Sequence, residues 1–124
     1  MFFKHLWLAL LCALVVLILC VIPGQDMPQV GIINFDKAVH AIMFGGLTFL
    51  FAKGFYKQTT YAFLNHDYLV TAFLFCTLYG GFLEIVQATV CINRAGDWLD
   101  FLFDGIGALA VIGILNLKKD LLLR

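Results

Sequence analysis

The stretch "LWLALLCALVVLILCVI", residues 6–22, contains no charged side chain. Together with residues 1–5, it is long enough to cross a hydrocarbon core of about 30 Å as an α-helix. Lys4 resembles the short basic region of a secretory signal peptide, but no small-x-small cleavage site follows the run. We therefore predict a retained membrane-spanning helix, which ends at Pro23 and Gly24.

The rest of the chain indicates the same class of protein. Of its 124 residues, 63% are hydrophobic and 13% are charged, whereas about a quarter of the residues in soluble domains are charged. In the second apolar stretch, Asp36 and Lys37 mark the start, and Lys53 and Gly54 mark the end. We predict an all-α integral membrane protein, a four-helix bundle forming one domain over residues 1–124. The predicted helices are about 4–22, 36–53, 68–90 and 99–117.

The positions of the basic residues predict the orientation of the bundle, because lysine and arginine collect on the cytoplasmic side of a membrane. With both termini in the cytoplasm, only Lys37 and Arg94 face outward. The inner basic residues are then Lys4, Lys53, Lys57, Lys118, Lys119 and Arg124. The formal net charge is zero, which gives no electrostatic reason to expect a nucleic-acid partner.

Three ionisable side chains, His40, Glu84 and Asp104, lie at least one turn inside the ends of the predicted helices, where hydrocarbon makes them costly and function is the usual reason for them. At 1.5 Å per residue, Glu84 lies roughly 24 Å from the inner start of the third helix. His40 and Asp104 each lie about 6 Å inward from the outer ends of their helices. We therefore predict that the three side chains meet at one level near the outer leaflet.

Further polar residues lie on the same helix faces or at the outer helix ends. Asp36 precedes His40 by one turn, and Gln87 shares a face with Glu84. Asp97, Asp100 and Asp104 form one stripe on the fourth helix. The candidate binding residues are Asp36, Lys37, Gln87, Arg94, Asp97, Asp100 and Asp104.

Structural roles also account for several of these residues. Asp97 and Asp100 suit the amino end of a helix as caps. His40 suits a hydrogen-bonded interior position, Gln87 suits a contact between helices, and Arg94 suits an ion pair. The glycines favour close helix contacts; they are Gly45, Gly46, Gly80, Gly81, Gly105 and Gly107.

A metal site built from His40, Glu84 and the aspartates is chemically reasonable, because zinc and manganese accept imidazole and carboxylate ligands together. Nothing in the spacing of these residues requires a metal ion. We therefore assign no metal ligand and expect no cofactor.

Two blocks of sequence carry a family resemblance. "DKAVH", residues 36–40, has the form D-K-x-x-H at the outer end of a helix. "EIVQATVCINRAGDWLDFLFDGIG", residues 84–107, has E-x-x-Q, an arginine seven residues later, then acids and a final glycine. Together they resemble the VanZ-like family of small bacterial membrane proteins, named for a teicoplanin-resistance protein. Asp104 stands where that family usually has asparagine, and the usual proline and glycine before Arg94 are absent.

The resemblance implies a multi-pass protein of the bacterial cytoplasmic membrane. It would bind or act on an envelope precursor, a lipid headgroup or a glycopeptide-type antibiotic at the outer leaflet. Lys37 and Arg94 would hold an anionic group, and Glu84 and His40 are the candidates for proton transfer. Whether the protein is an enzyme stays open at this point.

Two other functions fit the same sequence. One is a small proton-coupled exporter, in which a membrane glutamate alternates between a proton and a substrate. The other is a structural clasp, in which the polar cluster holds helices together while a membrane-protein partner supplies the function. A homo-oligomer is equally compatible with the sequence.

Overall fold

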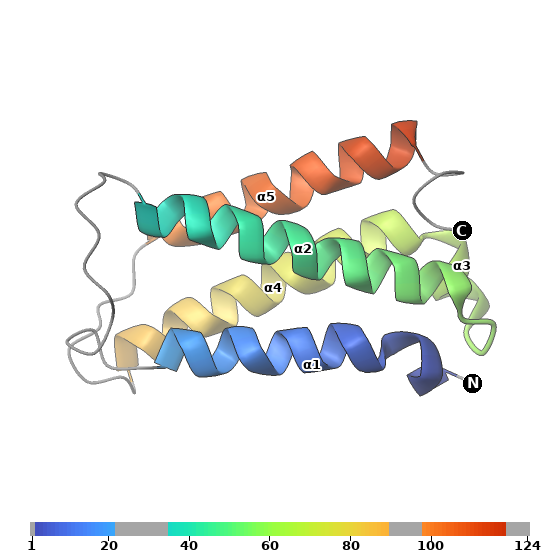
Figure 1. The fold of residues 1–124 in the computed structure, drawn as a ribbon, viewed down its shortest axis with the longest axis horizontal. Helices are drawn as coiled ribbons and strands as arrows, with labels where there is room; N and C mark the ends of the chain where they lie inside the picture. Colours follow the sequence, from blue (N-terminus) through green and yellow to red (C-terminus); the bar gives the residue numbers. More distant parts are fainter. Residues whose placement is uncertain (1, 22–34, 90–97, 119–124) are drawn as a thin grey trace.

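The protein is a bundle of four long helices that lie side by side along its longest axis (Figure 1). The computed structural model describes residues 2–21, 35–89 and 98–118, and this part of the chain contains no strand. The helices are α1 (Phe2–Val21), α2 (Phe35–Lys57), the short α3 (Ala62–His66), α4 (Tyr68–Thr89) and α5 (Trp98–Leu117). The predicted all-α membrane bundle is confirmed.

The lengths of the helices suit a lipid bilayer, in which a helix satisfies all of its backbone hydrogen bonds internally. Three apolar segments are long enough to span the membrane: Phe2–Leu19, Ala38–Lys57 and Tyr68–Val86. The apolar part of α5, Phe101–Leu117, is shorter; at 1.5 Å per residue it covers about 26 Å. It corresponds to the fourth predicted span.

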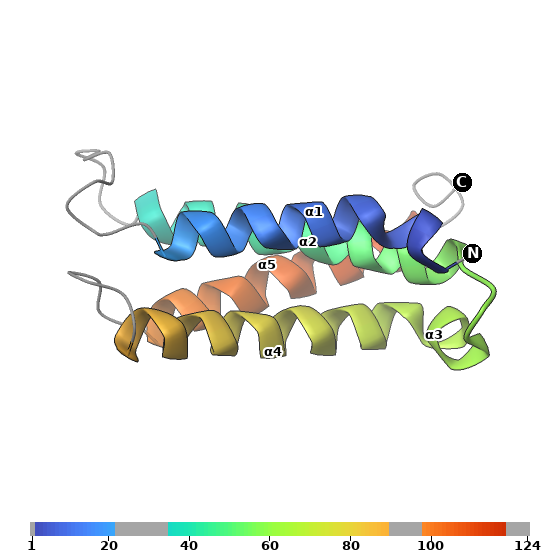
Figure 2. The same ribbon diagram turned by 90° about the horizontal axis from the view of Figure 1, so that it is seen from below.

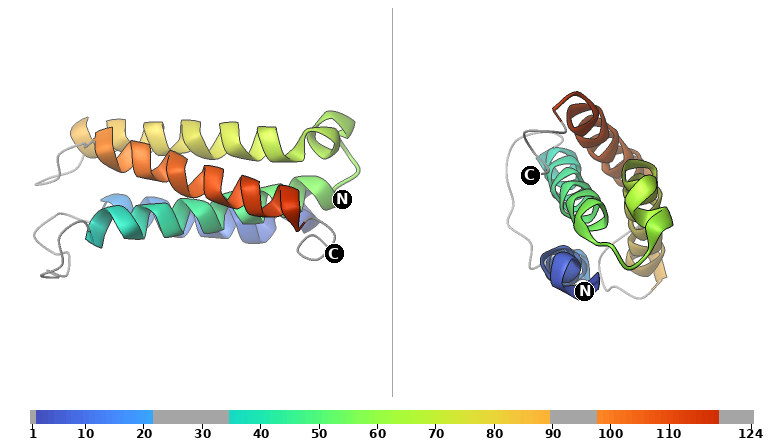
Figure 3. Two further views of the ribbon diagram at one scale, coloured as in Figure 1. Left: turned by 90° about the horizontal axis from the view of Figure 1, so that it is seen from above. Right: turned by 90° about the vertical axis from the view of Figure 1, so that its right-hand side faces the viewer.

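Helix α2 is the central element of the bundle. Half of its apolar segment is buried inside the protein, against 17% for α1 and 22% for α4. It contacts every other helix and packs most extensively against α5. The end-on view in Figure 3 shows α2 between α1 and α5. Residues on α2 are therefore the best placed to bring polar groups from several helices together.

Helices α2 and α5 approach each other closely because small residues face each other where they cross. A Cβ atom on Gly107 would overlap with the backbone of Ala41, and one on Gly45 would lie 3.2 Å from Val111. Close backbone approach of this kind drives helix association in membranes through van der Waals packing. The prediction of close glycine contacts is confirmed at Gly45, Gly80, Gly81 and Gly107. It is wrong for Gly46 and Gly105, which have no such neighbour among the residues that the structure describes.

The predicted end of the second helix at residue 53 is wrong, because α2 continues for another turn to Lys57. Gly54 does not end the helix. It is buried against α1, where a Cβ atom would lie 2.6 Å from the Leu6 side chain. The Lys53 ammonium lies 5.8 Å from the centre of the Phe49 ring, and the residue is partly exposed. A charged residue at position 53 therefore does not require the helix to end there.

The two ends of the bundle differ in charge. The start of α1, the ends of α2 and α5, and the short helix α3 lie at one end, as Figure 2 shows. Four of the five lysines in the described residues fall in or directly beside these segments: Lys4, Lys53, Lys57 and Lys118. The fifth, Lys37, lies in the first turn of α2 at the opposite end. The positive-inside rule predicts that the end with the four lysines faces the cytoplasm. The start of α2, the end of α4 and the start of α5 lie at the opposite end.

Candidate functional site

A buried hydrogen bond joins the two helices that pack most closely. His40 lies in the second turn of α2 and Asp104 in the second turn of α5. The Nδ1 atom of His40 lies 2.9 Å from Oδ1 of Asp104, and their side chains are 8% and 1% exposed. Buried polar groups of this type cost free energy unless they are paired, so each residue stabilises the buried position of the other.

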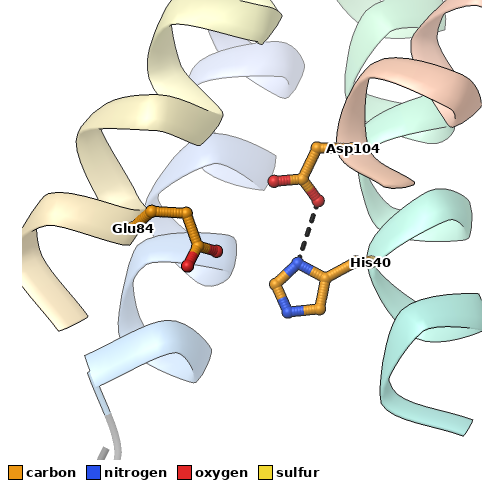
Figure 4. A group of neighbouring side chains, drawn as sticks. All are labelled: His40, Glu84 and Asp104. Carbon is orange, nitrogen blue, oxygen red and sulfur yellow. Dashed lines mark hydrogen bonds and ion pairs between the residues drawn. The ribbon is translucent and has the colours of Figure 1, made fainter. Parts of the chain in front are cut away.

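Glu84 of α4 completes the cluster from a third helix. Figure 4 shows the side chains of Glu84, His40 and Asp104 pointing into one space between α2, α4 and α5. One ring nitrogen of His40 and one carboxylate oxygen from each acid all lie within 4.8 Å of one another. The prediction that these three residues meet at one level of the bundle is confirmed.

Neighbouring residues fix the position of Asp104. Gly80 lies one turn before Glu84, and a Cβ atom on it would lie 2.9 Å from Oδ2 of Asp104. The ring of Phe44, one turn after His40, is parallel to the imidazole, with 6.5 Å between the ring centres. The absence of a side chain at Gly80 therefore leaves room for the carboxylate of Asp104.

The sequence indicated part of this arrangement but not all of it. Gly80 shares a helix face with Glu84, which predicts that it lies beside the site. Phe44 carried no signal, because an aromatic residue four positions from a histidine is indistinguishable from other core residues. Its position depends on how α2 rotates against α4 and α5.

A second histidine–carboxylate pair provides an internal comparison. His66 and Asp67 lie at the end of α3 and the start of α4, and the distance from Nδ1 to Oδ1 is again 2.9 Å. Their side chains are 84% and 60% exposed. Exposed pairs contribute little to stability because water screens them. The two pairs have the same length, so it is burial that distinguishes His40 and Asp104 from His66 and Asp67.

The other predicted site residues are only partly described. Asp36, Lys37, Gln87 and Asp100 lie in described helices, but their side chains are outside the described part of the structure. Arg94 and Asp97 lie wholly outside the described residues. By helical register, Asp36 and Asp100 each lie one turn nearer the outer end of the bundle than His40 and Asp104.

The three described groups form an acid–base and ligand set. When Asp104 is ionised, it accepts a hydrogen bond from Nδ1–H of His40, so Nε2 is then the basic nitrogen of the imidazole. Glu84 adds a second carboxylate within reach of the same space. Such a cluster is able to exchange protons with a bound molecule or to coordinate a cation.

Comparison with known proteins gives the family. A family model described as VanZ/LLP1 matches residues 2–119. No curated protein and no solved structure matches the chain. The match includes the three helices that carry the cluster and both sequence blocks in which its residues lie. The chain therefore belongs to the VanZ/LLP1 family, as its D-K-x-x-H and E-x-x-Q blocks predicted.

Proposed function

We propose that this protein binds the anionic headgroup of an envelope lipid or lipid-linked precursor and exchanges a proton with it. The binding site lies at the outer face of the bacterial cytoplasmic membrane. The observation that supports this proposal is the cluster of His40, Asp104 and Glu84 inside the bundle, near the end where α2 and α5 begin. Ionisable groups buried in a membrane bundle are retained mainly for function.

The cluster supplies proton transfer to this function. Asp104 orients the imidazole of His40 through their hydrogen bond. Glu84 is the second group that accepts or donates a proton in the same space. Two groups of this kind allow a headgroup oxygen to lose or gain a proton without bulk water.

Lys37 and Arg94 supply the positive charge for an anionic group. Arginine is well suited to phosphate, because its planar guanidinium donates two parallel hydrogen bonds. The namesake of the family confers teicoplanin resistance, so the proposed ligand is an envelope component that affects glycopeptide action. The glycopeptide itself is the other ligand that the family relationship suggests.

The first test measures teicoplanin susceptibility in a bacterial host that expresses the protein. We expect the wild type to shift the inhibitory concentration, and Glu84→Gln and His40→Asn to abolish the shift at equal membrane abundance. Asp67→Asn and His66→Asn are the matched controls, because they remove the same groups from the exposed pair. A shift that survives both Glu84→Gln and His40→Asn contradicts the proposal.

The second test identifies the ligand class directly. Protein in phosphatidylcholine nanodiscs is titrated with short-chain phosphatidylglycerol, free glycerol phosphate or teicoplanin. Saturable binding of the lipid alone supports a lipid headgroup, and binding of glycerol phosphate as well indicates recognition of phosphate without the lipid chains. Binding of teicoplanin alone makes the antibiotic the ligand and overturns the headgroup proposal.

A structural clasp is the second candidate, and one specific contact favours it. The hydrogen bond between His40 and Asp104 joins α2 to α5. A clasp predicts that Asp104→Asn and Glu84→Gln lower the thermal unfolding temperature in detergent. A functional site instead predicts little loss or even a gain, because clustered carboxylates strain the folded state.

A further inference from the structure

We propose that His40, Glu84 and Asp104 form a binding site for a divalent transition-metal ion, zinc or manganese. The three residues come from three helices, and their donor atoms lie within 4.8 Å of one another. Such convergence of one imidazole and two carboxylates arises only in the folded bundle. The proposal concerns the same site as the proposed function and depends on that function only for what completes the metal coordination. While the ion is bound, His40 and Glu84 act as ligands, so the proton exchange of the proposed function belongs to the metal-free site.

The donor set selects the class of metal ion. Carboxylate oxygen and imidazole nitrogen together suit zinc and manganese, whereas calcium and magnesium prefer oxygen ligands alone. Metal–ligand bonds of about 2.0–2.2 Å place the donor atoms about 3–4 Å apart around the ion. The donor atoms of the three residues already lie within 4.8 Å of one another, so the proposed site requires the side chains to move closer together by about 1 Å.

The charge of the site favours a cation. Two carboxylates held this close together in a medium of low polarity repel each other. Asp104 is 1% exposed, so water does little to screen its charge. A divalent ion balances both carboxylates at once, and its ligands are already held on three packed helices.

The surrounding residues hold the ligands in place. Asp104 is held against the surface of Gly80, where even a methyl group would lie 2.9 Å from its Oδ2 atom. His40 is parallel to the Phe44 ring on the same helix. Ligands that are fixed before the ion binds lose less conformational entropy when it binds.

Three protein ligands leave at least one coordination position for another molecule. This is the usual composition of zinc sites that act on substrates, in contrast to the four protein ligands of structural sites. In the proposed function, that position accepts water or an oxygen of the anionic headgroup. The ion would then neutralise the headgroup charge together with Lys37 and Arg94.

The test is isothermal titration of the chelator-treated full-length protein, in phosphatidylcholine nanodiscs, with Zn²⁺ and separately with Mn²⁺. We expect one saturable site per chain. We also expect Glu84→Gln and Asp104→Asn each to weaken it by about tenfold or more, since even second-shell changes reach this size. Asp67→Asn and His66→Asn are the matched controls and leave the affinity unchanged. Thermal unfolding of each variant shows whether it is folded.

Absence of saturable Zn²⁺ and Mn²⁺ binding to the wild type overturns the proposal, whatever the variants do. Binding that survives Glu84→Gln and Asp104→Asn in folded protein, or that Asp67→Asn removes, also overturns it. The proposed function fails separately. If Zn²⁺ binds but phosphatidylglycerol does not, the metal site stands alone. If phosphatidylglycerol binds equally well to chelator-treated protein and no metal binds, only the headgroup proposal stands.

Discussion

At the scale of single residues, burial separates the candidate site from similar groups elsewhere. His40 and His66 both contact an aspartate at 2.9 Å, but only His40 is removed from water. A neutral histidine at an exposed site has water as an alternative partner, whereas His40 depends on protein groups. The chemistry that we propose therefore belongs to the buried pair and to Glu84 beside it.

Gly80 gives a residue-scale prediction. In Gly80→Ala, the new methyl group meets Oδ2 of Asp104 at 2.9 Å and Phe44 at 3.3 Å, so the carboxylate must turn away. We expect a stability loss of about 1–3 kcal/mol, typical of overpacking, and weaker Zn²⁺ binding by titration. Gly46→Ala is the control, because a methyl group there has no neighbour within 4 Å. Equal behaviour of the two variants would contradict this account of Asp104.

At the scale of elements, the contact between α2 and α5 places the site. The backbones approach at Ala41 and Gly107, one turn or less from His40 and Asp104 along their helices. A helix pair with such small residues at the crossing is held by many short-range contacts, each of them weak. The spacing of the two helices therefore determines the distance between the imidazole and the carboxylate.

Gly107→Ala tests this dependence. Its new Cβ atom would overlap with the Ala41 carbonyl, and the backbone cannot rotate away as a side chain can. We expect α2 and α5 to separate, with a loss of about 1–3 kcal/mol or more in the free energy of unfolding. Thermal unfolding in detergent measures this loss. Gly105→Ala is the matched control on the same helix, since a Cβ atom there meets nothing within 4 Å.

At the scale of the whole molecule, the bundle presents apolar surface to lipid and separates charge between its ends. The large side chains Trp7, Leu14, Leu78 and Leu109 are more than half exposed. In water such a surface would drive aggregation, but in a bilayer it contacts acyl chains of similar polarity. The excess of lysines at the end that carries α3 predicts that this end faces the cytoplasm.

The orientation is directly testable by cysteine labelling. In a cysteine-free variant, Thr60→Cys places a thiol in the exposed segment between α2 and α3, and Gln29→Cys places one in the predicted outer loop. We expect a membrane-impermeant maleimide added to intact cells to label only the second variant. Both variants should react after the cells are opened. Labelling of Thr60→Cys in intact cells would invert the orientation and place the His40 cluster on the cytoplasmic side.

The sequence alone determined the class of fold and the level of the site. Long apolar runs specify membrane helices, because unpaired backbone groups are too costly in hydrocarbon. The constant rise of a helix then placed His40, Glu84 and Asp104 at similar depth. The two sequence blocks also predicted the family that the VanZ/LLP1 match confirms.

Only the tertiary structure decided which of these residues meet and how closely. The depth of a residue along its helix does not tell how the helix is rotated or which helices lie beside it. The rotation and the neighbours depend on packing, such as the close approach of Gly107 to Ala41. The same limit explains the error at Gly54, which looked like a helix end but is a contact with α1. The hydrogen bond between His40 and Asp104, and Glu84 beside it, result from packing of side chains far apart in sequence.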